Sequence, residues 1–264
     1  MSVQLNQAPW FNPGGTHGPL PLAPLGTDPS PELVRYFHAM SEALGPMHWW
    51  PARTPFEVIV GAILTQSASW TNVEKAIANL RAARMLTPSA IAKSRISRLA
   101  ELVRPSGYFR QKAKKLKAFA RFLQREHGGS LKRMFLTPAL DLRATLLSVH
   151  GIGPETADSI LLYAGSKPVF VVDAYTHRIF GRHEITGDKP DYERVRALFE
   201  GALPRDPRLF NEFHALIVNT GKQWCRKSAP HCEDCPLRHL LPEASPYNQV
   251  VTLPSNSLPS EATA

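Results

Sequence analysis

The spacing of apolar residues between about 55 and 165 most constrains the fold. Here almost every segment repeats its apolar residues with the 3.6-residue period of an α-helix. One such face is Phe56, Ile59, Val60, Ile63 and Leu64. Strand-like alternation is nearly absent, since only the short run 168–172 resembles a strand. Helices must therefore pack on helices, and the predicted class is all-α.

Length and charge bound the kind of protein. The chain has 264 residues, 43% of them hydrophobic, which is enough for one large or two small domains. Its 31 Lys and Arg exceed its 22 Asp and Glu, and the net charge of +9 is typical of polyanion-binding proteins and also of merely well-solvated ones. Neither a membrane-spanning apolar run nor a secretory signal is visible. We therefore expect a cytoplasmic protein.

One region stands out for its positive charge. Between Arg104 and Arg125 the sequence holds eight basic residues and no acidic one. Four of them share a face at helical spacing: Arg110, Lys114, Lys117 and Arg121. This stripe is either a solvated outer face or a surface that meets phosphates.

The most specific local pattern is the run 146–158, in which Gly151 and Gly153 flank Ile152 and precede Pro154. An apolar helix is predicted to end at His150. The glycines allow backbone torsions that other residues resist, and Pro154 begins a second helix. Backbone N–H groups at such a helix start bind phosphate without reading sequence. An ordinary αα-hairpin is the alternative.

A single aspartate follows the strand-like run. Asp173 comes directly after the apolar residues 168–172 and precedes a helical pattern. It is predicted to cap that helix at its N-terminus. A carboxylate acting in a cleft is the sharper hypothesis, and the two roles are compatible.

The only three cysteines lie close together, at Cys225, Cys232 and Cys235. Thiolates with this C-x6-C-x2-C spacing usually hold zinc or an iron–sulfur cluster, and both normally take four protein ligands. His239 and Asp234 are the nearest substitutes for the missing ligand. A non-protein ligand would also complete the set, and a cysteine run that holds no metal is compatible with the spacing too.

The glycine hairpin, the downstream Asp173 and the cysteine tail together resemble the helix-hairpin-helix DNA glycosylases of the endonuclease III superfamily, over residues 32–241. The resemblance implies two lobes. One is a six-helix barrel with the hairpin, at 52–166, and the other is a helical lobe with an iron–sulfur cluster, at 30–51 plus 167–242. The active site is expected in the cleft between them. Residues 1–29 and 243–264 are predicted to be disordered tails.

This resemblance implies a specific chemistry. Asp173 would be the catalytic carboxylate, stabilising positive charge on the sugar as the glycosidic bond breaks. Bifunctional members carry a nucleophilic lysine two residues after the second hairpin glycine. Here that position is Glu155, at a helix N-terminus, and a carboxylate cannot form a Schiff base. A monofunctional enzyme that leaves an abasic site is therefore implied.

The resemblance also implies where DNA would be held. A monovalent cation is implied at the hairpin, and the partner is double-stranded DNA containing damaged bases. The residues implied to contact the DNA backbone are Gly151, Ile152, Gly153, Thr156, Lys114 and Arg110.

A closer likeness is to the 3-methyladenine DNA glycosylase III branch, through Trp49-Trp50-Pro51 and the motifs at 63–66, 104–108 and 111–114. It implies a base pocket in which an electron-poor alkylated purine stacks on aromatic faces. The implied pocket residues are Trp49, Trp50, Pro51, Trp70 and Lys222, with ordinary core packing, or a surface position for the lysine, as the alternative. Gln66 is implied to fill the gap left by the flipped base, or else it is a buried amide.

The chain also departs from both patterns. The alkylpurine branch lacks the cysteine tail, whereas endonuclease III has a fourth cysteine where this chain has Leu241. The resemblance thus implies a ligand-deficient [4Fe–4S] cluster with His239 as its tentative fourth ligand.

We expect a monomeric, nucleoid-associated base-excision glycosylase that is monofunctional and removes alkylated purines. The alternatives are an oxidised-pyrimidine or mismatch glycosylase on the same scaffold, and a catalytically silent module that binds damage.

Overall fold

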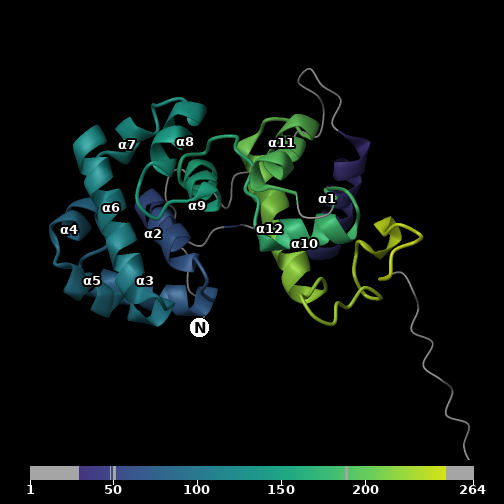
Figure 1. Cartoon of the computed structure of the whole chain (residues 1–264), viewed down its shortest axis with the longest axis horizontal. Helices are drawn as coiled ribbons and strands as arrows, with labels where there is room; N and C mark the ends of the chain where they lie inside the picture. Colours follow the sequence, from purple (N-terminus) through teal and green to yellow (C-terminus); the bar gives the residue numbers. More distant parts are fainter. Residues whose placement is uncertain (1–29, 48, 50–51, 188–189, 248–264) are drawn as a thin grey trace, which may run out of the picture.

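The computed structural model describes residues 30–47, 49, 52–187 and 190–247. Over these residues it contains twelve α-helices and no strand (Figure 1), which confirms the all-α class. The first six are α1 (Pro31–Leu44), α2 (Pro55–Thr65), α3 (Trp70–Ala82), α4 (Pro88–Lys93), α5 (Ile96–Leu102) and α6 (Phe109–His127). The others are α7 (Leu131–Met134), α8 (Ala139–Leu147), α9 (Pro154–Ser159), α10 (Ala174–Arg182), α11 (Tyr192–Ala202) and α12 (Pro207–Gln223). Short 3-10 turns η1 (Arg104–Ser106) and η3 (Arg238–Leu240) and a π-helical turn η2 (Ile160–Ala164) complete the set.

Two hydrophobic clusters divide these helices into two bodies (Figure 1). Helices α2 to α9 surround the first cluster, and α2 is apolar on nearly all sides because it runs through that core. Helices α1 and α10 to α12 surround the second. Aromatic rings fill much of this second core: Phe170 stacks on Phe199 with centroids 4.2 Å apart, and Phe213 meets both rings edge-on. The described chain therefore starts in the second body with α1, forms the first body with α2 to α9, and returns to the second body with α10 to α12.

The return crossing is the strand-like run, and it forms no strand. Residues 167–173 have no regular secondary structure, and side chains bond two of their backbone N–H groups. The N–H of Phe170 donates to Glu200 at 3.0 Å, and that of Val172 donates to the Tyr192 hydroxyl at 3.4 Å. The apolar run is buried because it passes between helices, which is why its composition resembles a strand.

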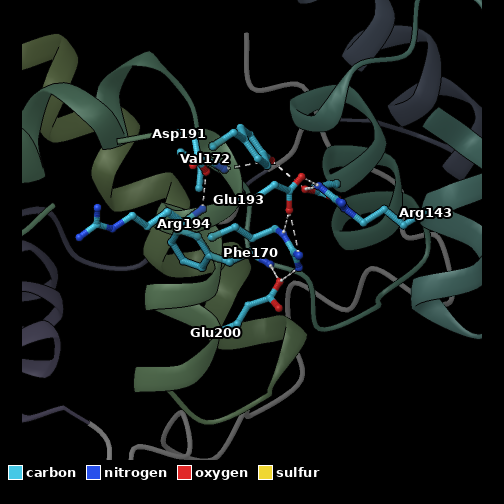
Figure 2. Close-up of polar contacts among 10 residues, drawn as sticks. Arg143, Phe170, Val172, Asp191, Glu193, Arg194 and Glu200 are labelled. Atoms are coloured by element: carbon cyan, nitrogen blue, oxygen red, sulfur yellow. Dashed lines mark hydrogen bonds and ion pairs between the residues drawn. The ribbon is translucent and has the colours of Figure 1, made fainter. Parts of the chain in front are cut away.

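A polar network joins the two bodies beside this crossing (Figure 2). Arg143 of α8 donates two hydrogen bonds to Asp158 of α9, at 2.6 and 3.1 Å, and a third at 2.6 Å to Glu193 of α11. The hydroxyl of Tyr192 donates to Asp158 at 2.8 Å. Asp158 is fully buried, so its carboxylate is neutralised within the protein. The network therefore fastens the hairpin side of one body to α11 of the other.

The ends of the described chain pack against the second body. Ser30 precedes α1 without a hydrogen bond from its side chain to the helix, and its N–H donates to the carbonyl of Ala202. Ordered contacts extend a few residues past the predicted start of the C-terminal tail at 243. Ser245 is 1% exposed, and Arg182 lies 4.8 Å from the centre of the Tyr247 ring. The predicted tail 1–29 and residues 248–264 lie outside the described residues. Among the described helices, none is both long and apolar enough to cross a membrane.

Candidate active site

The glycine hairpin lies at the edge of the first body. Helix α8 ends at Leu147, slightly before the predicted end at His150, and a turn leads into α9. Gly151 has φ of +82°, in the left-handed region that favours glycine. Gly153 has φ of −96° and ψ of 179°, which any residue adopts, so the prediction of special torsions is wrong for this glycine. A Cβ on Gly153 would have nothing within 4 Å, so this glycine leaves the start of α9 open.

The hairpin is tied to the end of α2 through Gln66. Its Nε2 donates to the carbonyl of Gly151 at 3.1 Å and to the Thr156 hydroxyl at 2.8 Å, while its Oε1 accepts from Lys115. The aliphatic stem of Lys115 lies against Gly151, so close that a Cβ there would meet it at 2.3 Å. In this structure the Gln66 amide is therefore hydrogen-bonded within the protein, as in the buried-amide alternative, and it is half-buried. Its insertion into a flipped-base gap stays a prediction that requires these bonds to break.

Helix α6 carries the predicted basic stripe. Arg110 and Lys114 are exposed, and the Lys115 contact brings their helix beside the hairpin. Lys117 was predicted on the same outward stripe, but it is buried and donates to the carbonyl of Ser94. The reason is that α4 packs on α6 and the lysine neutralises the carbonyl end of α4. The stripe is therefore narrower than predicted.

Lys112 of the same helix is 2% exposed, although nothing in the sequence singled it out as buried. Its ammonium donates to the carbonyl of Leu64 at 2.9 Å and to that of Ser106 at 2.5 Å. Burial, and secondarily the charge of Lys115, lowers the pKa of Lys112 to about 8. The side chain joins α2, η1 and α6 just below the Gln66 turn.

Asp173 is the N-cap of α10, as predicted, with a reciprocal bond through Thr176. Its Oδ1 accepts hydrogen bonds from the N–H of Tyr175 at 2.9 Å, from the N–H of Thr176 at 2.8 Å and from the Thr176 hydroxyl at 3.0 Å. The side chain is 13% exposed. The three donors hold one carboxylate oxygen fixed, which leaves Oδ2 for other contacts.

Glu155 occupies the first turn of α9, the predicted place, and is exposed to solvent. Surrounding protein removes part of its hydration, and the charge of Asp173 lies close by. Together these effects raise the pKa of Glu155 to about 7. Two carboxyl groups with different surroundings therefore face the same region: Asp173 has fixed donors, and Glu155 has none among the described residues.

A buried histidine lies behind Asp173. His214, in the middle of α12, is 5% exposed, and its Nε2 lies 3.7 Å from Oδ2 of Asp173. Its Nδ1 is 2.5 Å from the hydroxyl of Tyr163, on η2. Burial lowers the pKa of His214, although the charge of Asp173 opposes this. Burial raises the pKa of Tyr163 well above its usual value, with a smaller contribution from Asp173 and Glu155. Both rings are therefore neutral.

The predicted base pocket is only partly described. Trp49 packs against the second hydrophobic cluster, and the ammonium of Lys222 lies 5.4 Å from the centre of a Trp49 ring. Trp49 also interacts with Tyr163, which connects it to the Asp173 region. Trp70 begins α3 and packs against the first cluster, so the two tryptophans come from opposite bodies. Trp50 and Pro51 lie outside the described residues.

The three cysteines line one pocket between α10 and the C-terminal segment, together with Leu241. They are unbridged, and Arg182 donates to the sulfur of Cys225 at 3.2 Å. Burial raises the pKa of Cys235 to about 11. His239, the tentative fourth ligand, is not among the residues that line this pocket, but lines a neighbouring one with Tyr36 and His183. In the described part of the chain no three His, Cys, Asp or Glu side chains are placed to hold a single metal ion.

Sequence reasoning missed His214, Tyr163 and Lys115. His214 is the one strongly polar residue in the buried run 213–218, and such a polar interruption is a usable signal. Tyr163 gave no signal because it lies among other apolar residues of a helical pattern. Lys115 was hidden among many basic neighbours, since spacing alone does not say which lysine meets the hairpin.

Comparisons with known proteins agree on the kind of molecule. A profile described as "HhH-GPD superfamily base excision DNA repair protein" matches residues 60–205. "Putative DNA repair glycosylase MJ1434" of Methanocaldococcus jannaschii is 44% identical over 208 residues, which cover 78% of this chain and 94% of that protein.

Solved structures extend the likeness to three dimensions. The 3-methyladenine DNA glycosylase MagIII of H. pylori, bound to 1,N6-ethenoadenine, superposes with a TM-score of 0.63 at 30% identity, covering 73% of this chain and 95% of that one. A non-covalent complex of endonuclease III with DNA superposes with a TM-score of 0.70 at 22% identity, covering 80% and 95%, and supports the fold alone.

Proposed function

Because the chain belongs to the HhH-GPD superfamily of base excision DNA repair proteins and is a DNA glycosylase of that family, we propose that it is a monofunctional enzyme that removes alkylated purines. The observation that carries this proposal is the pair of carboxyl groups Asp173 and Glu155, which lie close enough for the charge of one to raise the pKa of the other. The start of α9 thus presents an acid, not an amine.

Hydrolysis without a covalent amine intermediate suits this arrangement. As the bond from sugar to base breaks, positive charge grows on the sugar, and an ionised carboxylate stabilises it. Asp173 has one oxygen fixed by three donors, so its orientation is set before the substrate arrives. Glu155 cannot form a Schiff base, so the reaction ends with an abasic site and an intact strand.

Two features support alkylated purines as the substrate: the negative charge of the two carboxyl groups and the aromatic ring of Trp49. A ring-alkylated purine is electron-poor, and the two carboxyl groups place negative charge in the region it enters. The side chain of Trp49 interacts with Tyr163 near those groups, and its ring would supply the aromatic face. The H. pylori neighbour binds 1,N6-ethenoadenine, a ring-modified purine, at 30% identity. Such a leaving group is already activated, so a strong general acid is not required.

The decisive experiment uses duplex oligonucleotides that each carry one lesion: 3-methyladenine, 1,N6-ethenoadenine, an oxidised pyrimidine or a G·T mismatch. Strand breaks are scored with and without alkali, and borohydride trapping is scored in parallel. We expect alkali-dependent breaks on the alkylated purines and no trapped complex. Prompt breaks, or trapping, would refute the monofunctional proposal, and preference for the pyrimidine or mismatch would refute the substrate.

A pair of variants separates catalysis from capping. Asn caps a helix about as well as Asp, so Asp173→Asn should keep the fold and the DNA affinity while abolishing base release. Asp191→Asn is the matched control, because Asp191 is the exposed N-cap of α11 and accepts the N–H of Arg194 at 2.7 Å. Full activity in Asp173→Asn would remove Asp173 from the mechanism.

We further propose that Cys225, Cys232 and Cys235 hold an iron–sulfur cluster with one iron lacking a protein ligand. The residues fit this group because the sulfurs line a common pocket but do not converge on one ion, and Leu241 lines the pocket where a fourth cysteine would be expected. Such a cluster would brace α10 against the C-terminal segment and could exchange an electron. The readout is visible absorption and iron content of the anaerobically purified protein.

A further inference from the structure

Two neutral side chains, His214 and Tyr163, lie behind Asp173 on the side of its Oδ2 atom. His214 is buried in α12, and its Nε2 has no hydrogen-bond partner within the described structure. This nitrogen lies 3.7 Å from the free oxygen of Asp173, Oδ2, just beyond hydrogen-bond length. A buried, unpartnered ring nitrogen aimed at a carboxylate is costly unless it finds a partner. Contacts in active sites commonly shorten to hydrogen bonds only when the substrate is bound.

Tyr163 sets the direction of the proton on His214. The hydroxyl lies 2.5 Å from Nδ1, and the phenol keeps its proton because it is buried. Donation from that hydroxyl to Nδ1 leaves the ring proton on Nε2, where it points to Oδ2 of Asp173. The opposite tautomer would bring a nitrogen lone pair against the carboxylate, which is repulsive. The three groups therefore form one directed chain from Tyr163 through His214 to Asp173.

We infer that His214, oriented by Tyr163, is a positioning residue that donates from Nε2 to Oδ2 of Asp173 in the DNA complex. This inference rests on the proposed function, because it concerns the carboxylate of Asp173 that we propose to be catalytic. The N-terminal amides of α10 fix Oδ1, and His214 fixes Oδ2. Both oxygens are then held, so the carboxylate cannot rotate away from the sugar and stays ionised while the bond breaks.

Other charged groups lie near the series Tyr163, His214 and Asp173. The charge of Asp173 acts on Glu155 of α9, and Glu155 acts on Tyr163. Lys222 lies two turns further along α12, over Trp49. As Glu155 ionises near neutral pH, its charge opposes that of Asp173. His214 therefore acts through the orientation of the Asp173 carboxylate, whereas Glu155, with a pKa of about 7, changes its charge near neutral pH.

The test compares His214→Phe, which keeps the ring volume but has no N–H, with His214→Gln, which keeps a donor. Single-turnover base release is measured on a duplex containing 1,N6-ethenoadenine, and affinity is measured on the same duplex with an abasic analogue. His214→Phe should slow release about ten-fold or more, as expected for loss of a hydrogen bond to a charged group. It should also shift the acid limb to higher pH and leave affinity within about two-fold, since the side chain is buried away from the surface.

His214→Gln should recover most of the lost rate, and Tyr163→Phe should give an intermediate loss because the tautomer is no longer fixed. An unchanged rate and acid limb in His214→Phe, or an equal loss in His214→Gln, would overturn the assignment. Nitrogen-15 NMR of the wild-type histidines gives a readout that needs no activity. A proton on Nε2 of His214 supports the chain, and a proton on Nδ1 overturns it. If the wild type releases no base from any lesion, the proposed function fails, and the NMR result still decides the His214 assignment.

Discussion

The two hairpin glycines should respond in opposite ways to a single methyl group. Gly151→Ala places a Cβ at φ of +82° and 2.3 Å from the Lys115 side chain. A non-glycine residue in this region costs about 1–3 kcal/mol. Moving Lys115 also breaks its bond to Gln66, which adds about 1 kcal/mol. The expected loss of unfolding free energy is therefore about 2–4 kcal/mol.

Gly153→Ala meets none of these obstacles. Its φ of −96° suits alanine, and no atom lies within 4 Å of the new Cβ. Because alanine restricts the unfolded chain, the variant should be more stable by about 0.4–1 kcal/mol. The methyl group would, however, stand over the start of α9, where we expect a DNA phosphate. Losing a charge-assisted N–H contact there should weaken DNA binding about ten-fold or more.

The assay pairs urea denaturation with fluorescence anisotropy on an abasic-analogue duplex, for both variants and for Gly201→Ala. Gly201 lies in α11, where a Cβ also has nothing within 4 Å, and it should gain stability without losing affinity. If Gly153→Ala binds DNA like Gly201→Ala, the hairpin does not hold the phosphate. If Gly151→Ala is no less stable than Gly153→Ala, the strain described at Gly151 is absent.

Three further predictions concern other groups of the molecule. Arg143→Met should lower the free energy of unfolding, measured in urea, by about 3–5 kcal/mol because it leaves the buried Asp158 carboxylate without its charge partner. Adding Asp158→Leu should recover much of that loss, and no recovery would show that lost packing dominates. The pKa of Glu155 is raised from its ordinary value of 4.5 to about 7, so this group stabilises the fold below pH 4.5, and the contribution is lost as the pH rises to about 7. The free energy of unfolding of Glu155→Gln, measured in urea, should therefore change less between pH 4.5 and 7 than that of the wild type. Cys232→Ala should remove the visible absorption and bound iron of the purified protein while base release survives; a colourless but folded wild type would refute the cluster.

The all-α class was predictable because helical periodicity records which side chains are buried. The faces at Phe56–Leu64 and the cap at Asp173 follow from local rules, and the structure shows both. Local rules failed where tertiary packing decides. Lys117 has the spacing of an exposed residue, yet the end of α4 lies over it. The run 168–172 has strand composition because it is buried, and burial alone does not supply a partner strand.

The candidate site was predictable only in part, since it is assembled from distant segments. Resemblance brought Asp173, Glu155 and Gln66 to attention, but pairing them with their neighbours requires coordinates. His214 is 41 residues from Asp173 in sequence, and Tyr163 is 51 residues from His214. No periodic pattern encodes such separations. His239 shows that closeness in sequence is not closeness in space, because it follows the cysteines by a few residues but lines a neighbouring pocket.

The network of Arg143, Asp158 and Tyr192 has a mechanical consequence. The two bodies are joined there by the hydrogen bond from Tyr192 to Asp158 and by the ion pair between Arg143 and Glu193, and a protein fastened in this way resists bending to reach the base. The elastic work of reshaping then falls on the double helix, and that work is smallest where stacking and pairing are already weakened. Stiffness between the two bodies would thus act as a first filter for damage, before any pocket touches the base.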